Sequence, residues 1–95
     1  MNVRFVWDNR KAASNLRKHG VSFEEARTVF ANPLAVIFDD EIHSAVERRE
    51  IIVGYSENKQ LILVCFTERE GDVRIISARC ATAKEQRDYE KGTGL

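Results

Sequence analysis

Residues 73–90 read VRIISARCATAKEQRDYE, a pattern that predicts a β-strand followed at once by a helix. The first seven positions are rich in β-branched side chains, which favour strands. Thr82 and Glu85 then have the spacing of a capping box, in which each side chain bonds a backbone N–H at the start of a helix. Two guanidinium groups on the strand, with Glu85 and Tyr89 on the helix, form a set of side chains that suits an anion such as phosphate.

Upstream of this join, capping and turn residues divide the chain into one strand, two helices and three more strands. Asp8 is placed to cap the first helix, and Gly20 to end it in a left-handed conformation. Ser22 and Glu25 form a second capping box, and Asn32-Pro33 ends the second helix. The predicted strands cover residues 3–7, 34–38, 50–55, 61–67 and 73–79; the predicted helices cover residues 9–18, the stretch between Ser22 and Asn32, and a last helix that opens at Thr82 and frays at Gly92.

Strands and helices in separate runs predict an α+β fold. The order is a strand, two helices, four strands that form a mostly antiparallel sheet, and a C-terminal helix, all within one domain over residues 1–95. Short turns after Tyr55 and Arg69 make the last three strands antiparallel neighbours. The nearly unbroken apolar run 61–67 predicts a central strand covered on both faces. Leu16 is expected on the core face of the first helix.

The composition narrows the classes of function. Lys and Arg number 15 and Asp and Glu also number 15, so no overall field attracts nucleic acid, and RNA or DNA must bind through a local patch. No apolar run reaches the roughly 18 residues of a membrane span, and no secretory signal is visible, so a cytoplasmic protein is expected. Cys65 and Cys80 are interpreted as buried thiols rather than a disulfide. The two histidines and two cysteines lack the spacing of a metal site, and no phosphate-binding loop indicates a cofactor.

Four arginines on adjacent predicted strands are the first group of candidate residues. Arg74 and Arg79 differ in parity, so a regular strand would point them to opposite faces unless a bulge turns one of them. They either bind an anion or form structural ion pairs with Glu85 or Glu90. Arg49 and Arg69, at the ends of neighbouring strands, could converge with them.

Lys11, Lys18 and His19 form a second group on the first helix. In the structural interpretation, the charges at the end of that helix complement its dipole. In the functional one, His19 is the natural general acid or base because imidazole titrates near neutral pH. Tyr89 lies one turn after Glu85, where it either packs the last helix on the sheet or contacts a ligand.

Two blocks of residues, one in each half of the chain, follow a family pattern. The first contains FVWD (5–8), Lys11, Asn15, KHGVSFEEA (18–26), Phe30 and Asn32-Pro33; the second contains His43-Ser44, Arg49, Gly54, Thr67, Arg69, RIISAR (74–79), Ala81, Glu85 and Tyr89-Glu90. This succession resembles the BrnT toxins. The resemblance implies a RelE-like α+β fold and a ribonuclease toxin of a type II toxin–antitoxin system that cleaves RNA, free or ribosome-bound, and inhibits translation. It also implies a BrnA-like ribbon-helix-helix antitoxin, a heterotetramer with two copies of each chain, and operator DNA bound only through the antitoxin.

Metal-free RNA cleavage uses the neighbouring 2′-hydroxyl as nucleophile, so the protein must supply a base, an acid and donors for the charge on phosphorus. The catalytic residues predicted on this basis are His19, Lys18, Arg74, Arg79, Glu85 and Tyr89, and the substrate-binding residues are Lys11, Arg49 and Arg69. His19, Lys18 and Glu85 remain alternatives for the acid and base. The neutral net charge favours a second function, a non-catalytic module that binds an antitoxin and acts as a transcriptional corepressor.

Overall fold

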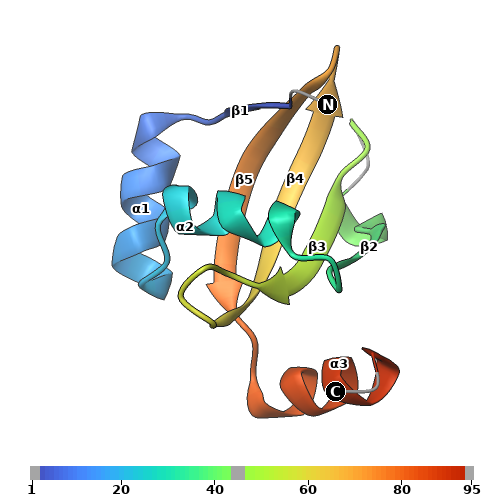
Figure 1. Cartoon of the computed structure of the whole chain (residues 1–95). Helices are drawn as coiled ribbons and strands as arrows, with labels where there is room; N and C mark the ends of the chain where they lie inside the picture. Colours follow the sequence, from blue (N-terminus) through green and yellow to red (C-terminus); the bar gives the residue numbers. More distant parts are fainter. Residues whose placement is uncertain (1–2, 44–46, 94–95) are drawn as a thin grey trace.

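The computed structural model of the chain describes residues 3–43 and 47–93. Its elements are β1 (Arg4–Val6), α1 (Asn9–His19), α2 (Phe23–Thr28), the 3₁₀ turn η1 (Val29–Ala31), β2 (Val36–Asp39), the 3₁₀ turn η2 (Glu41–His43), β3 (Glu50–Tyr55), β4 (Leu61–Arg69), β5 (Asp72–Cys80) and α3 (Ala83–Thr93) (Figure 1). The predicted α+β class is confirmed. Ser44, part of the family pattern quoted above, lies outside the described residues.

The sheet has five strands in the order β1-β5-β4-β3-β2, one more than predicted. The last three strands are antiparallel neighbours, as predicted, and β4 is central. The additional strand is β1, which pairs in parallel with β5 through Arg4↔Asp72 and Val6↔Arg74. The prediction missed this pairing because a parallel neighbour needs no local turn and so leaves no local signal.

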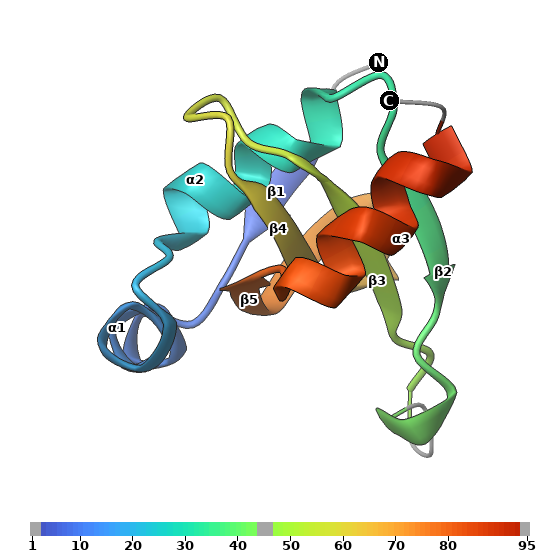
Figure 2. The ribbon, with the colours of Figure 1, turned by 90° about the horizontal axis from the view of Figure 1, so that it is seen from below.

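The two faces of the sheet are covered differently. The helix face, defined by Ile52, Ile62, Val64, Phe66 and Ile75, is buried under α2, η1 and the loop that joins α1 to α2. On the opposite side, α3 covers only one end of the sheet, where Tyr89 packs with Val53 and Leu61 (Figures 1 and 2). We call this second side the open face. The prediction that residues 61–67 are covered on both faces is therefore wrong in part, since Leu63 and Cys65 on the open face are only half-buried.

The predicted helix caps are present. Asp8 accepts hydrogen bonds from the backbone N–H groups of Arg10 (2.8 Å) and Lys11 (3.1 Å), and Gly20 ends α1 at φ 69°. Ser22 Oγ accepts from the N–H of Glu25 at 3.0 Å. The Glu25 carboxylate does not return this bond but accepts one from Ser56 Oγ at 2.7 Å, which ties α2 to the β3–β4 turn.

Asn15, and not Leu16, lies on the buried face of α1. The Leu16 side chain is 51% exposed, whereas Asn15 is 6% exposed. Asn15 Nδ2 donates to the carbonyls of Val21 (2.9 Å) and Ala78 (2.8 Å), and its Oδ1 accepts from the N–H of Ala78 at 3.0 Å. The Asn15 side chain thus bonds both backbone polar groups of Ala78 in β5. Ala78 lies beyond Arg74, the last residue of β5 that pairs with β1.

Both cysteines carry free thiols. Cys65 is half-buried, but Cys80 is exposed, so the expectation of two buried thiols is wrong for Cys80. No helix in the described ranges is long and apolar enough to cross a membrane.

Candidate functional site

A β-bulge brings the arginines of β5 to one face of the sheet. Cys65 pairs with Ser77 and the next residue of β4 pairs with Ile75, so Ile76 is an extra residue in β5. Arg74 and Arg79 therefore lie opposite residues 67 and 63 of β4, which alternate onto the same side. Of the two arrangements left open by the sequence, the structure has the one in which a bulge aligns both guanidinium groups, on the open face.

The open face contains a pocket of about 390 Å³ between β3, β5 and the segment that follows β2. Arg49 reaches it from the residue just before β3 and Arg79 from β5, while Leu63 and Cys65 of β4 lie between them. The remaining lining residues are Asp40, Ile42, His43, Ile51, Ile76, Ser77 and Ala78. This open-face pocket combines two guanidinium groups and the Asp40 carboxylate with a concave, largely apolar wall, which is the usual form of a ligand-binding site.

Arg79 is held in position by Glu85. Its two terminal nitrogens donate to the two carboxylate oxygens of Glu85 at 2.7 and 2.8 Å, a bidentate geometry. The hydrogen bonds from Arg79 and from the N–H of Thr82 (2.9 Å) lower the pKa of Glu85 to about 2. Glu85 is therefore a poor proton acceptor at neutral pH, and its role in this geometry is to orient the guanidinium group of Arg79, whose side chain remains 44% exposed.

Arg74 and Arg69 lie on the open face farther along the sheet. Arg69 Nε donates to Glu47 at 3.1 Å; the Arg69 side chain is mostly exposed, whereas that of Glu47 is half-buried. Arg74 is half-buried, lies in the field of Asp8 and Glu47, and its side chain makes no hydrogen bond or ion pair with another described residue. Its guanidinium donors are thus available to a ligand that extends from the open-face pocket.

The structure adds a histidine–aspartate pair that the sequence reasoning did not select. His43 Nδ1 lies 3.0 and 3.2 Å from the two carboxylate oxygens of Asp40. Asp40 is 9% exposed, and its N–H donates to the carbonyl of Arg49 at 2.9 Å, so the pair is anchored beside an arginine of the pocket. With Nδ1 engaged, Nε2 is the ring atom left to exchange a proton. The signal in the sequence was a histidine three residues after an aspartate, next to a strand end.

The basic residues of α1 lie elsewhere. Lys11, Lys18 and His19 are exposed on the helix that runs along the outer edge of β5, and none of them lines the open-face pocket (Figure 1). Their side chains form no hydrogen bond with any residue of the ranges 3–43 and 47–93. They form a separate basic group, in which Lys18 and His19, in the last turn of α1, complement the helix dipole, whereas Lys11 lies in the first turn.

Tyr89 has the geometry of a packing residue. It is 8% exposed, its ring meets that of Tyr55 edge-on with centroids 5.9 Å apart, and its hydroxyl donates to the carbonyl of Leu34 at 2.5 Å. These contacts fasten α3 to β3 and to the segment before β2, and they occupy the hydroxyl that a catalytic role would need.

The remaining polar groups of the described residues do not form a metal or thiolate site. Within the described residues, no three His, Cys, Asp or Glu side chains lie close enough together to bind a metal ion. Burial and the neighbouring Asp40 carboxylate raise the pKa of Cys65 to about 11, so its thiol is protonated at neutral pH. Cys65 therefore contributes surface to the open-face pocket and is not a nucleophile.

Comparison with known proteins places the chain in a family. Residues 7–85 match the family described as "Ribonuclease toxin, BrnT, of type II toxin-antitoxin system". The fold is similar to the 1.1 Å crystal structure of the Brucella abortus ribonuclease toxin BrnT, with a TM-score of 0.66 and 23% sequence identity over 85% of this chain and 99% of that chain. No curated protein matches the sequence. The chain belongs to the BrnT family of ribonuclease toxins of type II toxin–antitoxin systems.

Proposed function

We propose that this chain is an endoribonuclease that cleaves RNA without a metal ion in the open-face pocket, and that it inhibits translation in the cytoplasm by doing so. The observation that carries the proposal is the convergence of Arg49, Arg79 and the His43–Asp40 pair on one pocket. Membership of a ribonuclease family supports the class of reaction.

In the proposed reaction, the 2′-oxygen of RNA attacks the adjacent phosphorus and the bond to the 5′-oxygen breaks. One group must remove the proton of the 2′-hydroxyl and another must protonate the departing oxygen. We assign removal of the 2′-hydroxyl proton to His43 Nε2, because Asp40 holds the ring through Nδ1, and protonation of the departing 5′-oxygen to solvent water. Arg49 and Arg79 hold the phosphate oxygens, where their charge stabilises the more negative transition state.

Arg69 and Arg74 would bind the phosphates that flank the cleaved one, because they continue the line of guanidinium groups along the open face. Glu85 is a positioning residue for Arg79. We assign Lys11, Lys18 and His19 to an outer contact with the RNA backbone, since they lie outside the pocket. Positioning of the RNA in this way can lower the activation barrier by about 7–11 kcal/mol, so few acid and base groups are needed.

The proposal is tested by matched histidine variants. His43→Gln and His19→Gln remove one imidazole each, from inside and outside the open-face pocket. Cleavage of a fluorescent RNA oligonucleotide is measured in EDTA with each purified variant. We expect His43→Gln to slow cleavage about 100-fold or more, as loss of a general acid or base does, and His19→Gln to change it only slightly.

The opposite order of effects would move the acid–base site to the end of α1 and overturn the assignment to the pocket. Arg79→Lys and Arg79→Ala give a second measurement: both should lose most activity, since an ammonium group does not replace a bidentate guanidinium. Loss of wild-type cleavage in EDTA would contradict the metal-free mechanism.

We also propose a BrnA-like antitoxin with a ribbon-helix-helix part as the partner, two copies of each chain in the complex, operator DNA bound only through the antitoxin, and a RelE-like relationship of the fold.

A second candidate function is a non-catalytic corepressor. It is favoured by the ion pair that already occupies Arg79. A wild-type chain that binds its antitoxin but leaves RNA intact, at any salt concentration, would support this second function.

A further inference from the structure

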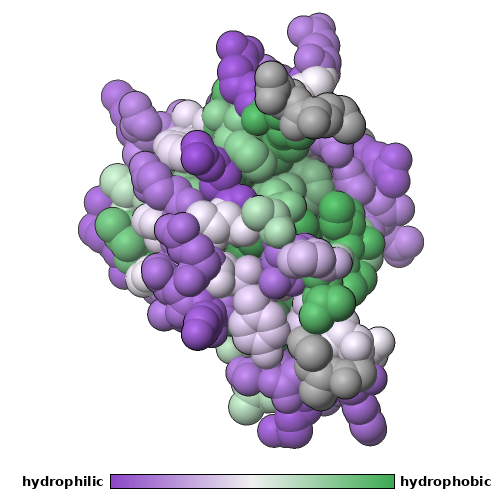
Figure 3. All heavy atoms as spheres, viewed as in Figure 1, coloured by the Kyte–Doolittle hydropathy of each residue, from purple (hydrophilic) through white to green (hydrophobic). Residues whose placement is uncertain are grey.

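The exposed apolar side chains of this protein are concentrated in one segment. Among the described residues, seven large apolar side chains are exposed, and five of them lie within residues 34–42. Figure 3 shows the corresponding apolar surface over β2, at the right of the view. The five are Leu34, Val36, Ile37, Phe38 and Ile42, with exposed fractions from 45% to 86%. Contiguous apolar surface of this kind is characteristic of an interaction site.

This segment contains an edge strand. Within residues 3–43 and 47–93, β2 is the last strand of the sheet and pairs only with β3. Its residues, Val36 to Asp39, include no lysine, proline or bulge, and the one charged side chain is that of Asp39 at its end. The outer backbone groups of β2 can therefore pair with an added strand.

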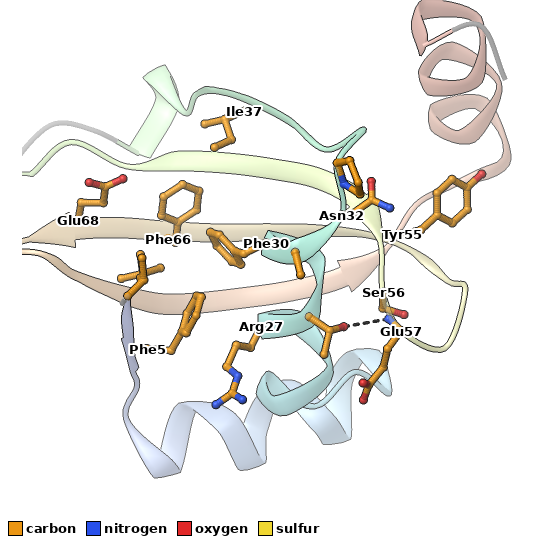
Figure 4. Close-up of a pocket in the computed structure, with 15 residues that line it drawn as sticks. Phe5, Arg27, Phe30, Asn32, Ile37, Tyr55, Ser56, Glu57, Phe66 and Glu68 are labelled. Atoms are coloured by element: carbon orange, nitrogen blue, oxygen red, sulfur yellow. Dashed lines mark hydrogen bonds between the residues drawn. The ribbon is translucent and has the colours of Figure 1, made fainter. Parts of the chain in front are cut away.

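Apolar grooves flank β2 on both faces of the sheet. On the helix face, Ile37 lies in a groove of about 1020 Å³ together with Phe5, Phe30 and Phe66, whose rings point into it (Figure 4). On the open face, Val36 and Phe38 line a second groove, of about 420 Å³, against α3. Side chains of an added strand alternate between the two faces, so each groove would receive every second one.

The charges around these grooves are mainly negative. The groove on the helix face is lined by Glu57, Glu68 and Arg27, and the groove on the open face by Glu85 and Asp88. Glu85 is paired with Arg79 and Asp88 with Lys84, so the excess negative charge lies on the helix face, where Glu57 and Glu68 accompany one guanidinium group. A second copy of this chain would bring its own carboxylates to the contact, whereas a segment flanked by lysine or arginine would complement them.

The same segment reaches the candidate active site. Ile42, which is 86% exposed, also lines the open-face pocket together with Arg49 and Arg79. A chain paired with β2 would continue past Ile42 and lie over the mouth of that pocket.

We propose that an extended apolar segment of the antitoxin, flanked by basic residues, adds to β2 as a sixth strand and closes the open-face pocket. The proposal rests on the proposed function, because a type II toxin has a protein antitoxin as its partner. It specifies the surface, the conformation and the charge of that partner.

The test uses the proposed BrnA-like antitoxin, purified and titrated against toxin variants by calorimetry. Ile37→Asp places a charge in the centre of the patch, and Leu16→Asp makes the same change at a side chain that is also 51% exposed but lies on α1. We expect Ile37→Asp to weaken binding about 100-fold, as loss of a central apolar anchor does, and Leu16→Asp to leave it unchanged. Glu68→Lys should weaken binding less and reduce its salt dependence. Hydrogen exchange of residues 36–39 should slow in the wild-type complex.

Equal affinities of Ile37→Asp and wild type, or unchanged exchange of residues 36–39, would overturn the proposal. A toxin that is dimeric alone and becomes monomeric in the Ile37→Asp variant would assign β2 to a second copy, which also overturns it. Circular dichroism and RNA cleavage by the free variants verify folding, since Ile37 is outside the open-face pocket. If wild type binds the antitoxin but does not cleave RNA, the proposed function fails while the docking result stands.

Discussion

Replacement of Asn15 by alanine is expected to destabilise the fold strongly. The side chain makes three buried hydrogen bonds, two donated to the carbonyls of Val21 and Ala78 and one accepted from the N–H of Ala78. At about 1 kcal/mol for each bond, the loss is about 3 kcal/mol, and buried groups left unsatisfied raise it further. A domain of this size has a total stability of about 5–14 kcal/mol, so the variant loses a large fraction of it.

The measurements are urea denaturation and thermal denaturation, both followed by the fluorescence of Trp7, the one tryptophan of the chain, whose ring centroid lies 5.9 Å from that of Phe23. Asn15→Ala should lower the melting temperature by about 12 °C or more, at 4–8 °C for each kcal/mol. Leu16→Ala, at the adjacent exposed position, should change stability by about 0.5 kcal/mol or less. Asn15→Asp keeps the acceptor but turns a carboxylate toward two carbonyls, so it should be at least as damaging.

A loss below about 1 kcal/mol in Asn15→Ala would refute this reasoning, because it would mean that water or a shifted backbone replaces all three bonds at little cost. The result would also show that α1 is held to the sheet by apolar contacts alone.

Three further predictions follow from the local geometry. The pKa of Glu85 is lowered from 4.5 to about 2 in the folded state. The ionised carboxylate of Glu85 therefore contributes fully to stability above pH 4.5, and this contribution is lost as the pH falls toward 2. Glu85→Gln should flatten the acid limb of a curve of stability against pH, while Glu24→Gln, at an exposed site, should not. In Gly54→Ala the added Cβ would lie 2.9 Å from a methyl group of the segment before β2, and the variant should lose about 1–3 kcal/mol in the same denaturation assay. A thiol reagent at pH 8 should label the exposed Cys80 well before Cys65, whose pKa is about 11; equal rates would contradict the burial of Cys65.

The local structure of this protein could be predicted from its sequence because each element is bounded by side chains that act over a few residues. Asp8, Gly20 and Ser22 cap or end helices by contacts within one turn, and the structure has them in these roles. The central position of β4 follows in the same way from its apolar run between two short turns.

The features that could not be predicted depend on contacts between distant residues. The bulge at Ile76 has no glycine or other marker, yet it decides that Arg74 and Arg79 share a face. His43 lies in an irregular segment, and its approach to the arginines becomes visible only once the sheet is assembled. Asn15 looked like an ordinary helix residue because its partner, Ala78, comes from the far end of the chain.

The parallel pairing of β1 with β5 affects the order in which the protein can fold during synthesis. Arg4 pairs with Asp72, so β1, which is synthesised first, can enter the sheet only after β5, the last strand, has been synthesised. At about 5–20 residues per second, the ribosome needs roughly 5–20 s to make the chain. The open-face pocket needs Arg79, whereas the apolar segment 34–42 is synthesised well before it. A nascent chain therefore exposes the surface we assign to the antitoxin before it possesses the pocket that the antitoxin would close.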